Sequence, residues 1–490
     1  MKARVLLFTC ALAMAASLPA LATAAPALAA AAPALATAAP AAPPISKDTL
    51  RLTLDDAVAR ALAFGDEARV ARAGVAIADG QVREAFAAAL PQVTGSVTYN
   101  RKFDSIFRNL GGGGDTTGIA DLFAATPFGA KHGWTADLTA SQMLWSGGRV
   151  GAGLSAARAV RTSARAERDE TLADVALTAR SAYLEAAYAA EVRRIAEEGL
   201  AQSRAHLAQV KLFRQQGSRS EYDLLQAQVD AANQEPAVVA ARNAAALALL
   251  DLRRALNLPL DQPLALVTPL AWADGMVPVL AKPAADGRDR NSIVSAEAMV
   301  RARRDALRAE KAGRWPQLTA SATISHQAYP LDLWPERRQF TRAIDGSIKL
   351  EWPLFQGFRT FGAVQRANAE LRRAEAQREQ VREGVAVQVE QAKQEAWRTQ
   401  ATLAARRGTA ALARRAHHLA TVRWQNGLST QLEVSDARLQ LQTAEVNEAA
   451  AYKDYRLALL RLERVTGHPL ALELTPIESL STNLPNDGDR

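Results

Sequence analysis

A glycine-rich segment is the part of the sequence that comes nearest to a nucleotide-binding loop. Residues 147–153, GGRVGAG, follow a strand-like run and open a helix-like run. A P-loop ends in Gly-Lys-Ser/Thr, because the lysine and the hydroxyl contact the phosphates and the magnesium ion. This segment lacks that ending, and the strand before it alternates polar and apolar residues. The sequence therefore does not predict nucleotide binding.

Candidate catalytic and metal-binding residues are sparse. His417 and His418 are adjacent, so on a helix they point to different faces, whereas paired helical ligands usually lie four residues apart. No Ser/His/Asp or Cys/His constellation stands out. The single cysteine, Cys10, lies in a segment expected to be removed, so the mature chain can form no disulfide. We predict that the protein is not an enzyme and has no cofactor or metal.

The N-terminus has the layout of a secretory signal peptide over residues 1–24. A basic start is followed by an apolar run and by Ala22-Thr23-Ala24, a small-x-small cleavage site. An uncleaved anchor helix is the alternative. Residues 25–48 are rich in Ala and Pro and predict a flexible tether. The tether carries a second Ala36-Thr37-Ala38, which leaves the cleavage position open.

Charge and hydropathy exclude two further classes of protein. Removal of Lys2 and Arg4 lowers the formal net charge from +8 to +6, and the basic residues are spread along helices, so nucleic-acid binding is not predicted. After the signal peptide no run of about 20 apolar residues exists, which is the length that a membrane-spanning helix needs. Any membrane segment of this chain is therefore expected to be β.

The mature chain is an internal duplication. LPQVTGSVTYN (90–100) resembles WPQLTASATIS (315–325), LWSGGR (144–149) resembles LFQGFR (354–359), and RQQGSRSEYDLLQAQ (214–228) resembles WQNGLSTQLEVSDAR (424–438). The last two matches share one offset of 210 residues, which indicates a true repeat. The extra residues of the first copy fall around Gly111–Gly114. We predict repeat 1 over 49–270, an inter-repeat equatorial segment over 271–289, repeat 2 over 290–475, and a flexible tail over 476–490.

Each copy contains two segments in which apolar and polar residues alternate. They cover residues 92–100, 134–144, 317–325 and 344–352. This period predicts strands with one apolar and one polar face, and about 9–11 residues is enough for a tilted strand to cross a membrane. Tyr99, Trp134 and Trp352 lie at strand ends, where interfacial aromatic residues gather. A soluble sandwich with one solvated face shows the same alternation and is the alternative.

Two segments without proline, residues 150–213 and 360–423, predict helices of unusual length. About 64 residues correspond to roughly 95 Å at 1.5 Å per residue. Small and apolar residues recur at three- and four-residue steps, as in a coiled coil. Gly217 and Gly427 then predict helix ends, and Ser218, Ser220, Ser429 or Thr430 can cap return helices over 220–256 and 430–466. Shorter helices are expected over 55–89 and 290–314, stacked end to end with the return helices.

Four strands cannot close a membrane barrel, and an open strand edge is not tolerated in lipid. Two copies would give eight strands and a lumen filled by side chains, whereas three would give twelve and room for a passage. Three copies also supply six long helices for a hollow tube. The sequence therefore predicts a homotrimer. The fold class is mainly α with a transmembrane β-barrel portion, built from a duplicated strand–helical-hairpin repeat.

Over about residues 49–475 the chain resembles the TolC-type outer-membrane efflux proteins (the outer membrane factor family). The resemblance lies in LTLDDAVARAL (52–62), the strand starts at Pro91-Gln92 and Pro316-Gln317, LWSGGR, LFQGFR and the two tip sequences. It implies a trimer with a twelve-stranded barrel in the outer membrane and a periplasmic α-helical tunnel. It also implies contact with outer-membrane lipid, a periplasmic adaptor protein and an inner-membrane pump, in a tripartite efflux or type I secretion system.

The resemblance also implies roles for residues at the tips. Glu433 and Asp436 match carboxylates that ring the periplasmic entrance of the family. They share a helix face, and three copies would select for cations; an ordinary solvated acidic face is the alternative. An inter-protomer latch of the family is matched by Asp223, Tyr222 and Trp424. The family often has a latch arginine at the position of Ser429, and here Arg219 or Arg423 can take its place. Contact with the adaptor is expected at the tip residues Gly217, Ser218, Gly427, Leu428 and Ser429.

The predicted function is a passive conduit for export across the periplasm and the outer membrane. The alternative is a periplasmic coiled-coil adaptor or scaffold without a barrel, and the four alternating strands are the feature that separates the two. The exported substrate and the class of pump are not readable from the residues.

Overall fold

The computed structural model describes residues 49–103, 130–272, 276–280, 285–330 and 332–476. All of them belong to one compact unit that begins at Asp48. The predicted signal peptide and tether, Gly111–Gly114 and the tail beyond Pro476 lie outside the described residues.

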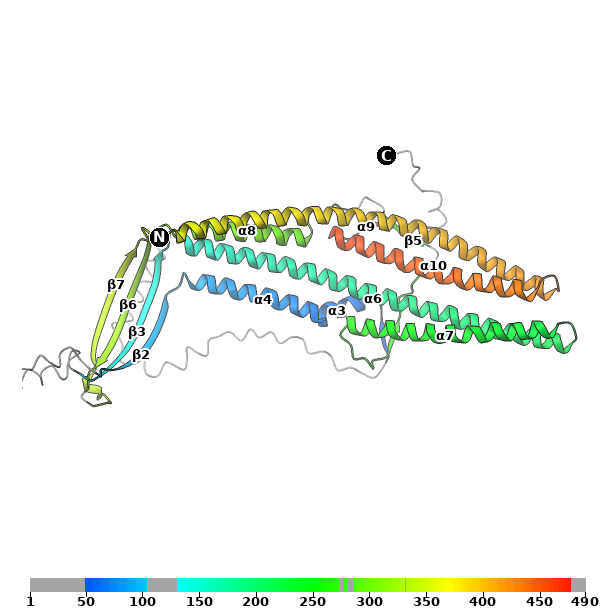
Figure 1. The fold of residues 1–490 in the computed structure, drawn as a ribbon, viewed down its shortest axis with the longest axis horizontal. Coiled ribbons are helices and arrows are strands. Elements are labelled where there is room, and N and C mark those ends of the chain that lie inside the picture. The colour runs from blue at the N-terminus through cyan, green and yellow to red at the C-terminus, as the bar shows by residue number, and fades with distance from the viewer. Residues whose placement is uncertain (1–48, 104–129, 273–275, 281–284, 331, 477–490) are drawn as a thin grey trace, which may run out of the picture. The chain divides into compact units, whose positions relative to one another are not determined.

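Two helices of equal length run through this unit, α6 (Arg149–Gln215) and α9 (Arg359–Gln425), each of 67 residues (Figure 1). The two helices start 210 residues apart, which is the offset of the sequence repeat. Neither contains proline, so the backbone hydrogen-bond ladder is not interrupted. At 1.5 Å per residue each is about 100 Å long. The prediction of two unusually long helices is confirmed.

Each long helix is followed by an antiparallel return helix. These are α7 (Glu221–Ala255), which packs on α6, and α10 (Gln431–Thr466), which packs on α9 (Figure 1). The reversals occur at Gly217 and Gly427, which both have a φ of +76°. Only glycine adopts this left-handed conformation without steric cost. The two predicted helical hairpins are therefore present.

The chain before the first strand forms two helices, so the expectation of one helix over 55–89 was wrong. They are α3 (Leu54–Phe64) and α4 (Asp66–Ala87). Gly65, between them, has an extended ψ of 140°, and a Cβ there would collide with the carbonyl oxygen of Ala61. Thr53 and Asp56 form a capping box that fixes the start of α3. In repeat 2 the equivalent segment is one helix, α8 (Asn291–Ala312).

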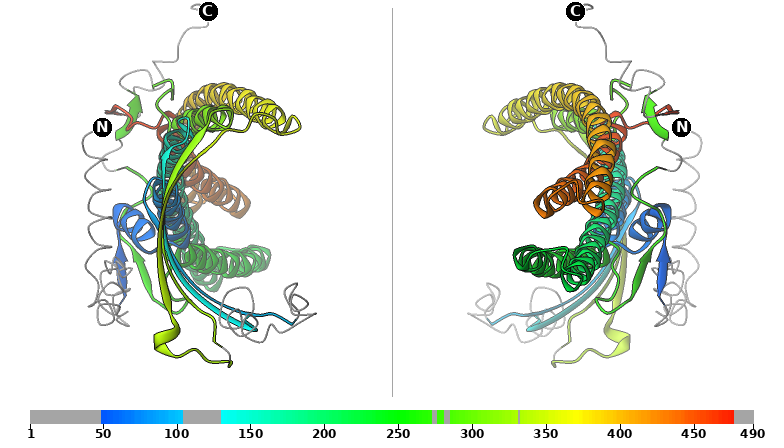
Figure 2. Two further views of the ribbon diagram at one scale, coloured as in Figure 1. Left: turned by 90° about the vertical axis from the view of Figure 1, so that its left-hand side faces the viewer. Right: turned by 90° about the vertical axis from the view of Figure 1, so that its right-hand side faces the viewer.

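The four predicted strands form one antiparallel sheet in the order β2-β3-β6-β7. They are β2 (Gln92–Arg101), β3 (His132–Trp145), β6 (Gln317–Ala328) and β7 (Thr341–Glu351). A 3₁₀ turn, η4 (Arg337–Gln339), lies in the β6–β7 connection. The central pair β3–β6 joins the two repeats. Figure 2 shows that the strands remain side by side and curve together.

Two small sheets around the middle of the long helices were not predicted. In one, β1 (Leu50–Leu52) pairs in parallel with β4 (Leu264–Leu266). In the other, β5 (Met276–Leu280) pairs antiparallel with β8 (Leu472–Pro476). The buried Tyr183 hydroxyl of α6 holds the first sheet, since it donates to the Leu52 carbonyl at 3.0 Å and accepts from the Thr268 amide at 2.9 Å.

The buried core is built from small side chains and a few large ones. Ala57, Ala179 and Tyr183 pack with Leu252 and Leu256 in one cluster. A second cluster collects residues from both repeats and from the small sheets, including Leu184, Val277, Leu403, Tyr455 and Leu459. Alanine lets helix axes approach closely, so the seams between helices are narrow.

A half-buried ionic network also connects the repeats. Glu170 of α6 accepts from Arg290 at the start of α8, at 2.8 Å, and from Arg464 of α10, at 2.9 Å. Arg464 reaches Asp174 as well, at 2.8 Å. One carboxylate of repeat 1 thus binds two guanidinium groups of repeat 2, which fixes the register between the halves.

Candidate channel wall and hairpin tips

The strands of the sheet are in register, so residues of one kind form rows across all four of them. An apolar row lies directly beside a polar row. The two rows are Gly95–Leu138–Ile324–Ile344 and Thr94–Thr139–Thr323–Asp345. Because successive residues of a strand point to opposite sides, one side of the sheet is apolar and the other is polar.

Hydrogen bonds between strands organise the polar face. Ser325 donates to Asp137 at 2.6 Å, and the hydroxyl groups of Thr139 and Thr323 lie 3.1 Å apart. The Ser321 and Ser347 hydroxyls lie 2.8 Å apart. This face suits contact with water.

The apolar face is not covered by other described parts of the chain. Val97 is 72% exposed, Ile348 70% and Leu350 64%. Aromatic rings border this sheet at both ends, namely Tyr99, Trp134 and Trp334 at one end and Trp145, Trp315 and Trp352 at the other. Among the strands that the structure describes, β2 and β7 each pair with a single neighbour, so these strands leave the backbone groups of both sheet edges unpaired. An uncovered apolar face and unpaired edges are typical of a sheet that contacts other molecules.

The first tip is capped in a way that fixes the direction of the return helix. After Gly217 the Ser218 amide bonds to the Phe213 carbonyl at 3.0 Å, as in a Schellman motif. Ser220 is then the N-cap of α7, and its hydroxyl and amide both donate to the Asp223 carboxylate. Asp223 therefore serves the cap of its own helix. Tyr222 is 73% exposed.

The second tip repeats this arrangement with a different carboxylate. Gly427 ends α9, and the Leu428 amide bonds to the Arg423 carbonyl at 2.9 Å. Thr430 caps α10 and accepts from the Glu433 amide. Glu433 in turn accepts from the Ser429 hydroxyl at 2.7 Å. These hydrogen bonds, that from Ser429 above all, lower the pKa of Glu433 below its ordinary value.

Glu433 and Asp436 lie three residues apart on α10, and both side chains are exposed. The buried face of this helix carries Val434 and Arg438 instead. The structure therefore leaves both carboxylates available to solvent. Their role at a pore entrance stays a prediction.

Trp424 occupies the centre of a small core that joins the two hairpins. It is 1% exposed and packs with Val210, Leu224 and Val434. The ring of His206 lies 4.4 Å from it and that of Phe213 5.6 Å, centroid to centroid. Sequence reasoning placed Trp424 at a contact between protomers; within the single chain its partners are its own hairpins, and the latch role stays a prediction.

Arg219 connects the first tip to the second. Its guanidinium lies 4.9 Å from the Trp424 ring centroid and donates to the Trp424 carbonyl at 3.0 Å. Arg423 donates only within its own tip, to Leu428 at 3.3 Å. Of the two arginines that the sequence offered in place of the missing latch arginine, Arg219 is the one that links hairpins within this chain.

A polar seam behind Trp424 was missed by sequence analysis. His206 bonds to Gln431 at 2.5 Å, and Asp230 accepts from Ser435 at 2.7 Å. Arg438, 5% exposed, lies 3.8 Å from Asp230. Burial lowers the pKa of both His206 and Arg438. The polar residues at i, i+4 and i+7 of α10 (431, 435 and 438) were the available signal, because they share a face with apolar Val434.

The described part of the chain contains no group of three His, Cys, Asp or Glu side chains able to hold a metal ion. None of the described helices combines the length and the apolar character needed to cross a membrane.

The model of the outer membrane efflux protein family matches residues 58–258 and 288–468. No curated protein matches significantly. Among solved structures, CusC matches with a TM-score of 0.69 and 19% identity, over 85% of this chain and 92% of that one.

Two further solved structures show the same fold. The outer membrane protein VceC from Vibrio cholerae matches with a TM-score of 0.66 and 21% identity, over 85% of this chain and 96% of that one. The outer membrane channel CmeC from Campylobacter jejuni matches with a TM-score of 0.68 and 15% identity, over 85% and 86%.

The duplicated strand-and-hairpin architecture with an uncovered apolar sheet defines an export-channel subunit. The chain belongs to the outer membrane efflux protein family. It is accordingly an outer-membrane channel subunit of an efflux system that extends into the periplasm. The family is a transport family and not a family of enzymes.

Proposed function

We propose that three copies of this chain close a single barrel of twelve strands, since each copy supplies four. The observation that supports this most is the sheet itself, which has an uncovered apolar face and two open edges. In lipid, every backbone N–H and C=O must be paired, and only a closed barrel satisfies the edges of a sheet. A barrel of eight strands is filled by its own side chains, whereas one of twelve has room for a passage.

The six long helices and their shorter partners then form a tube that continues the barrel. In each copy, α4 and α7 pack on α6, and α8 and α10 pack on α9. The proposed division of the chain is repeat 1 over 49–270, an equatorial segment over 271–289 and repeat 2 over 290–475, with the signal peptide, tether and tail as in the sequence analysis. A coiled-coil adaptor without a barrel does not explain the uncovered sheet.

At the far end of the tube, Glu433 and Asp436 of three copies would place six carboxylates around the entrance. Their exposure supports this proposal. Such a ring concentrates cations and slows anions. Asp223, Tyr222 and Trp424 are proposed as latch residues between tips, with Arg219 supplying the positive charge.

The tips Gly217–Ser218 and Gly427–Ser429 are proposed to contact a periplasmic adaptor protein that connects the channel to an inner-membrane pump. Leu428, 70% exposed, offers an apolar contact at the tip. The channel itself has no energy source in this proposal and acts as a passive conduit.

Fractionation and electrical recording test the proposal. The protein should fractionate with the outer membrane, migrate as a heat-modifiable oligomer on gels, and give discrete conductance steps in planar lipid bilayers. A monomer in the soluble fraction with no conductance would refute the channel. Capture of an adaptor and a pump from crosslinked cells by the full-length protein tests the proposed partners.

A further inference from the structure

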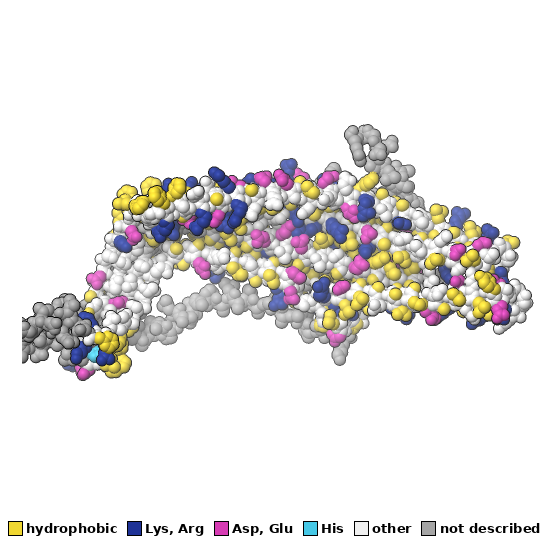
Figure 3. All heavy atoms as spheres, in the orientation of Figure 1, with side chains coloured by type: hydrophobic (Ala, Val, Ile, Leu, Met, Phe, Trp, Pro, Cys, Tyr) yellow, Lys and Arg dark blue, Asp and Glu magenta, His cyan; other side chains and the backbone are white. Residues whose placement is uncertain are grey.

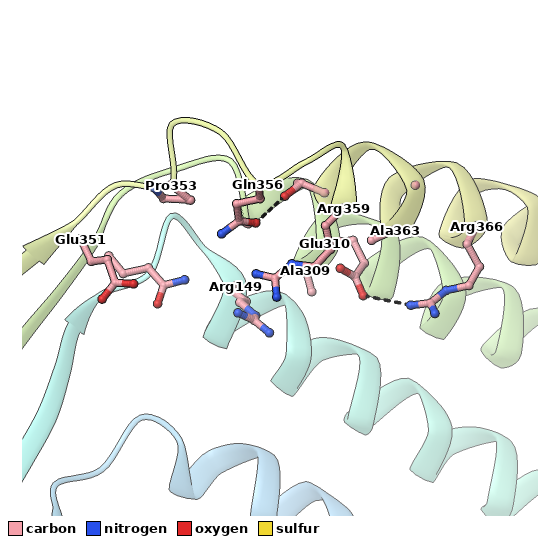
Figure 4. A pocket seen from close by; sticks show the side chains of 13 residues that line it. Arg149, Ala309, Glu310, Glu351, Pro353, Gln356, Arg359, Ala363 and Arg366 are labelled. Atoms are coloured by element: carbon pink, nitrogen blue, oxygen red, sulfur yellow. Dashed lines mark hydrogen bonds and ion pairs between the residues drawn. The ribbon is translucent and has the colours of Figure 1, made fainter.

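A hollow of about 540 Å³ lies where the strands meet the long helices. Its wall combines the start of α6, the end of α8, the start of β6, the end of β7 and the start of α9 (Figure 4). The charged residues that line it are Arg149, Arg359, Arg366, Glu310 and Glu351.

Only part of this charge is neutralised within the chain. Arg366 pairs with Glu310 at 3.8 Å, and Glu351 pairs with Lys349 at 2.7 Å. Arg149 and Arg359 have no carboxylate or hydrogen-bond partner for their side chains among the described residues. Both reach into the same hollow (Figure 4). Both arginine side chains are exposed to solvent, and an anion bound in the hollow would interact favourably with each of these charges.

The two arginines occupy equivalent places in the duplication. Arg149 is the first residue of α6 and Arg359 the first of α9, at the ends of LWSGGR and LFQGFR. A cation at the first position of a helix is unfavourable, because the helix dipole is positive there. Neither helix has an acidic residue in its first turn, and neither N-cap residue, Gly148 or Phe358, makes a side-chain cap. In α6 the Ser146 hydroxyl accepts from the Val150 amide at 3.2 Å. Helix stability does not explain two arginines in these places, whereas anion binding does.

The hollow opens on the polar side of the sheet. Gln317 and Glu351, which line it, are register partners, and alternation puts them on the side of Thr319 and Lys349. Apolar side chains gather where α9 begins (Figure 3); Phe358 is 76% exposed there and Phe361 61%. Phe361 lies two residues from Arg359 on α9 and hence on nearly the opposite side of that helix.

We propose that Arg149 and Arg359 form a binding site, inside the proposed passage, for the oxyanion group of an exported molecule, a carboxylate or a phosphate. This inference rests on the proposed channel, because the polar side of the sheet is then the lumen. The planar guanidinium forks match both groups with paired hydrogen bonds. The site lies at the opposite end of α6 and α9 from the tip carboxylates, so acidic cargo that has passed the entrance is held beyond it.

The first experiment measures binding to the full-length protein in neutral detergent. Inorganic phosphate is titrated at constant ionic strength and followed by phosphorus NMR. The Arg149→Gln/Arg359→Gln double variant should weaken phosphate binding about tenfold or more. The matched control is Arg337→Gln/Arg338→Gln, which removes two exposed charges in the β6–β7 connection and should change binding less than about twofold. Glu310→Gln, which frees Arg366, should strengthen binding.

Equal binding to the protein and the Arg149/Arg359 double variant would overturn the proposal, as would absence of binding. Thermal unfolding distinguishes a role of the two arginines in binding from a role in stability. The helix-dipole argument predicts that the double variant melts no earlier than the unaltered protein. Phosphatidylglycerol added to the micelles should not compete with phosphate. Competition would assign the site to a lipid headgroup and overturn the assignment to cargo.

The second experiment records conductance in planar bilayers with phosphate replacing chloride. Phosphate should reduce the current through the unaltered channel and have less effect on the double variant. Phosphate binding with no conductance at all would refute the channel, and with it the cargo assignment. Conductance that phosphate leaves unchanged would refute only the oxyanion site.

Discussion

Arg219 provides a direct test of how the two hairpin tips are held together. Its guanidinium is half-buried, stacks over Trp424 at 4.9 Å and donates to the Trp424 carbonyl at 3.0 Å. A partly exposed cation–π contact contributes about 0.5–1 kcal/mol, and a hydrogen bond from a charged group about 1.5–3 kcal/mol. Arg219→Gln is therefore expected to lower the free energy of local opening by about 2 kcal/mol at least.

Hydrogen exchange measures this opening in the intact protein. A loss of about 2 kcal/mol should speed exchange of the tip amides about 30-fold, in residues 213–224 and 422–434. Arg219→Lys keeps the charge but lacks the planar fork, so its effect should be intermediate.

Arg423→Gln is the matched control. It removes an arginine from the neighbouring tip whose hydrogen bond to Leu428 is long, 3.3 Å, and lies within one hairpin. Its effect on exchange should stay within about twofold. If Arg219→Gln accelerates exchange no more than Arg423→Gln does, the reasoning about the tip contact is wrong.

Three further predictions concern the entrance, the equator and the wall. The double variant Glu433→Gln/Asp436→Asn should reduce the preference of the channel for cations in planar bilayers, and unchanged selectivity would exclude the ring. Because the folded pKa of Glu433 is lowered, its charge and its capping bonds should persist below the ordinary carboxyl pKa. They should be lost only as the pH falls through the lowered value. Tyr183→Phe should lower stability by about 2–3 kcal/mol, measured by denaturant unfolding, since it removes two buried hydrogen bonds; a loss under about 0.5 kcal/mol would contradict this. Ile348→Arg should impair membrane assembly by about 2–4 kcal/mol if it lies at mid-depth, whereas Ser347→Arg on the polar face should assemble; equal assembly of both would argue against a lipid-facing side.

Local sequence patterns were sufficient to predict the main elements. The alternation in residues 92–100 and 317–325 specified β2 and β6, because a period of two has no other regular solution. The proline-free runs specified α6 and α9, and Gly217 and Gly427 specified their ends, since few residues other than glycine adopt the φ of +76° found there.

Features that depend on distant parts of the chain were not predictable. β1 has three residues and exists because β4, more than 200 residues later, lies beside it; such a short segment carries no period of its own. The break at Gly65 was missed because a lone glycine is tolerated within many helices. Thr53 and Asp56 carried the signal for the start of α3, whereas the end of that helix depends on close contact at Ala61.

For the candidate site as well, the sequence predicts the local placement of residues but not the contacts between distant segments. Glu433 and Asp436 are exposed on α10, where helix periodicity puts them. The environment of Trp424 was not predicted, because its partners come from α6, α7 and α10, and only the packed hairpins bring them together. Arg149 and Arg359 line one hollow for an equivalent reason, since their helices start 210 residues apart in the sequence and α8 packs on both of them.

The measurement that tests the central claim most directly is disulfide crosslinking between the two open edges of the sheet. Cys10 is the only cysteine of the sequence and lies in the predicted signal peptide, so cysteines introduced into β2 and β7 report only on each other. A series of such pairs, scanned along both strands in cells and run on denaturing gels, should yield at one register a covalent ladder that ends at three chains. A ladder that ends at two chains, or no crosslink at any register, would contradict a barrel closed by three copies.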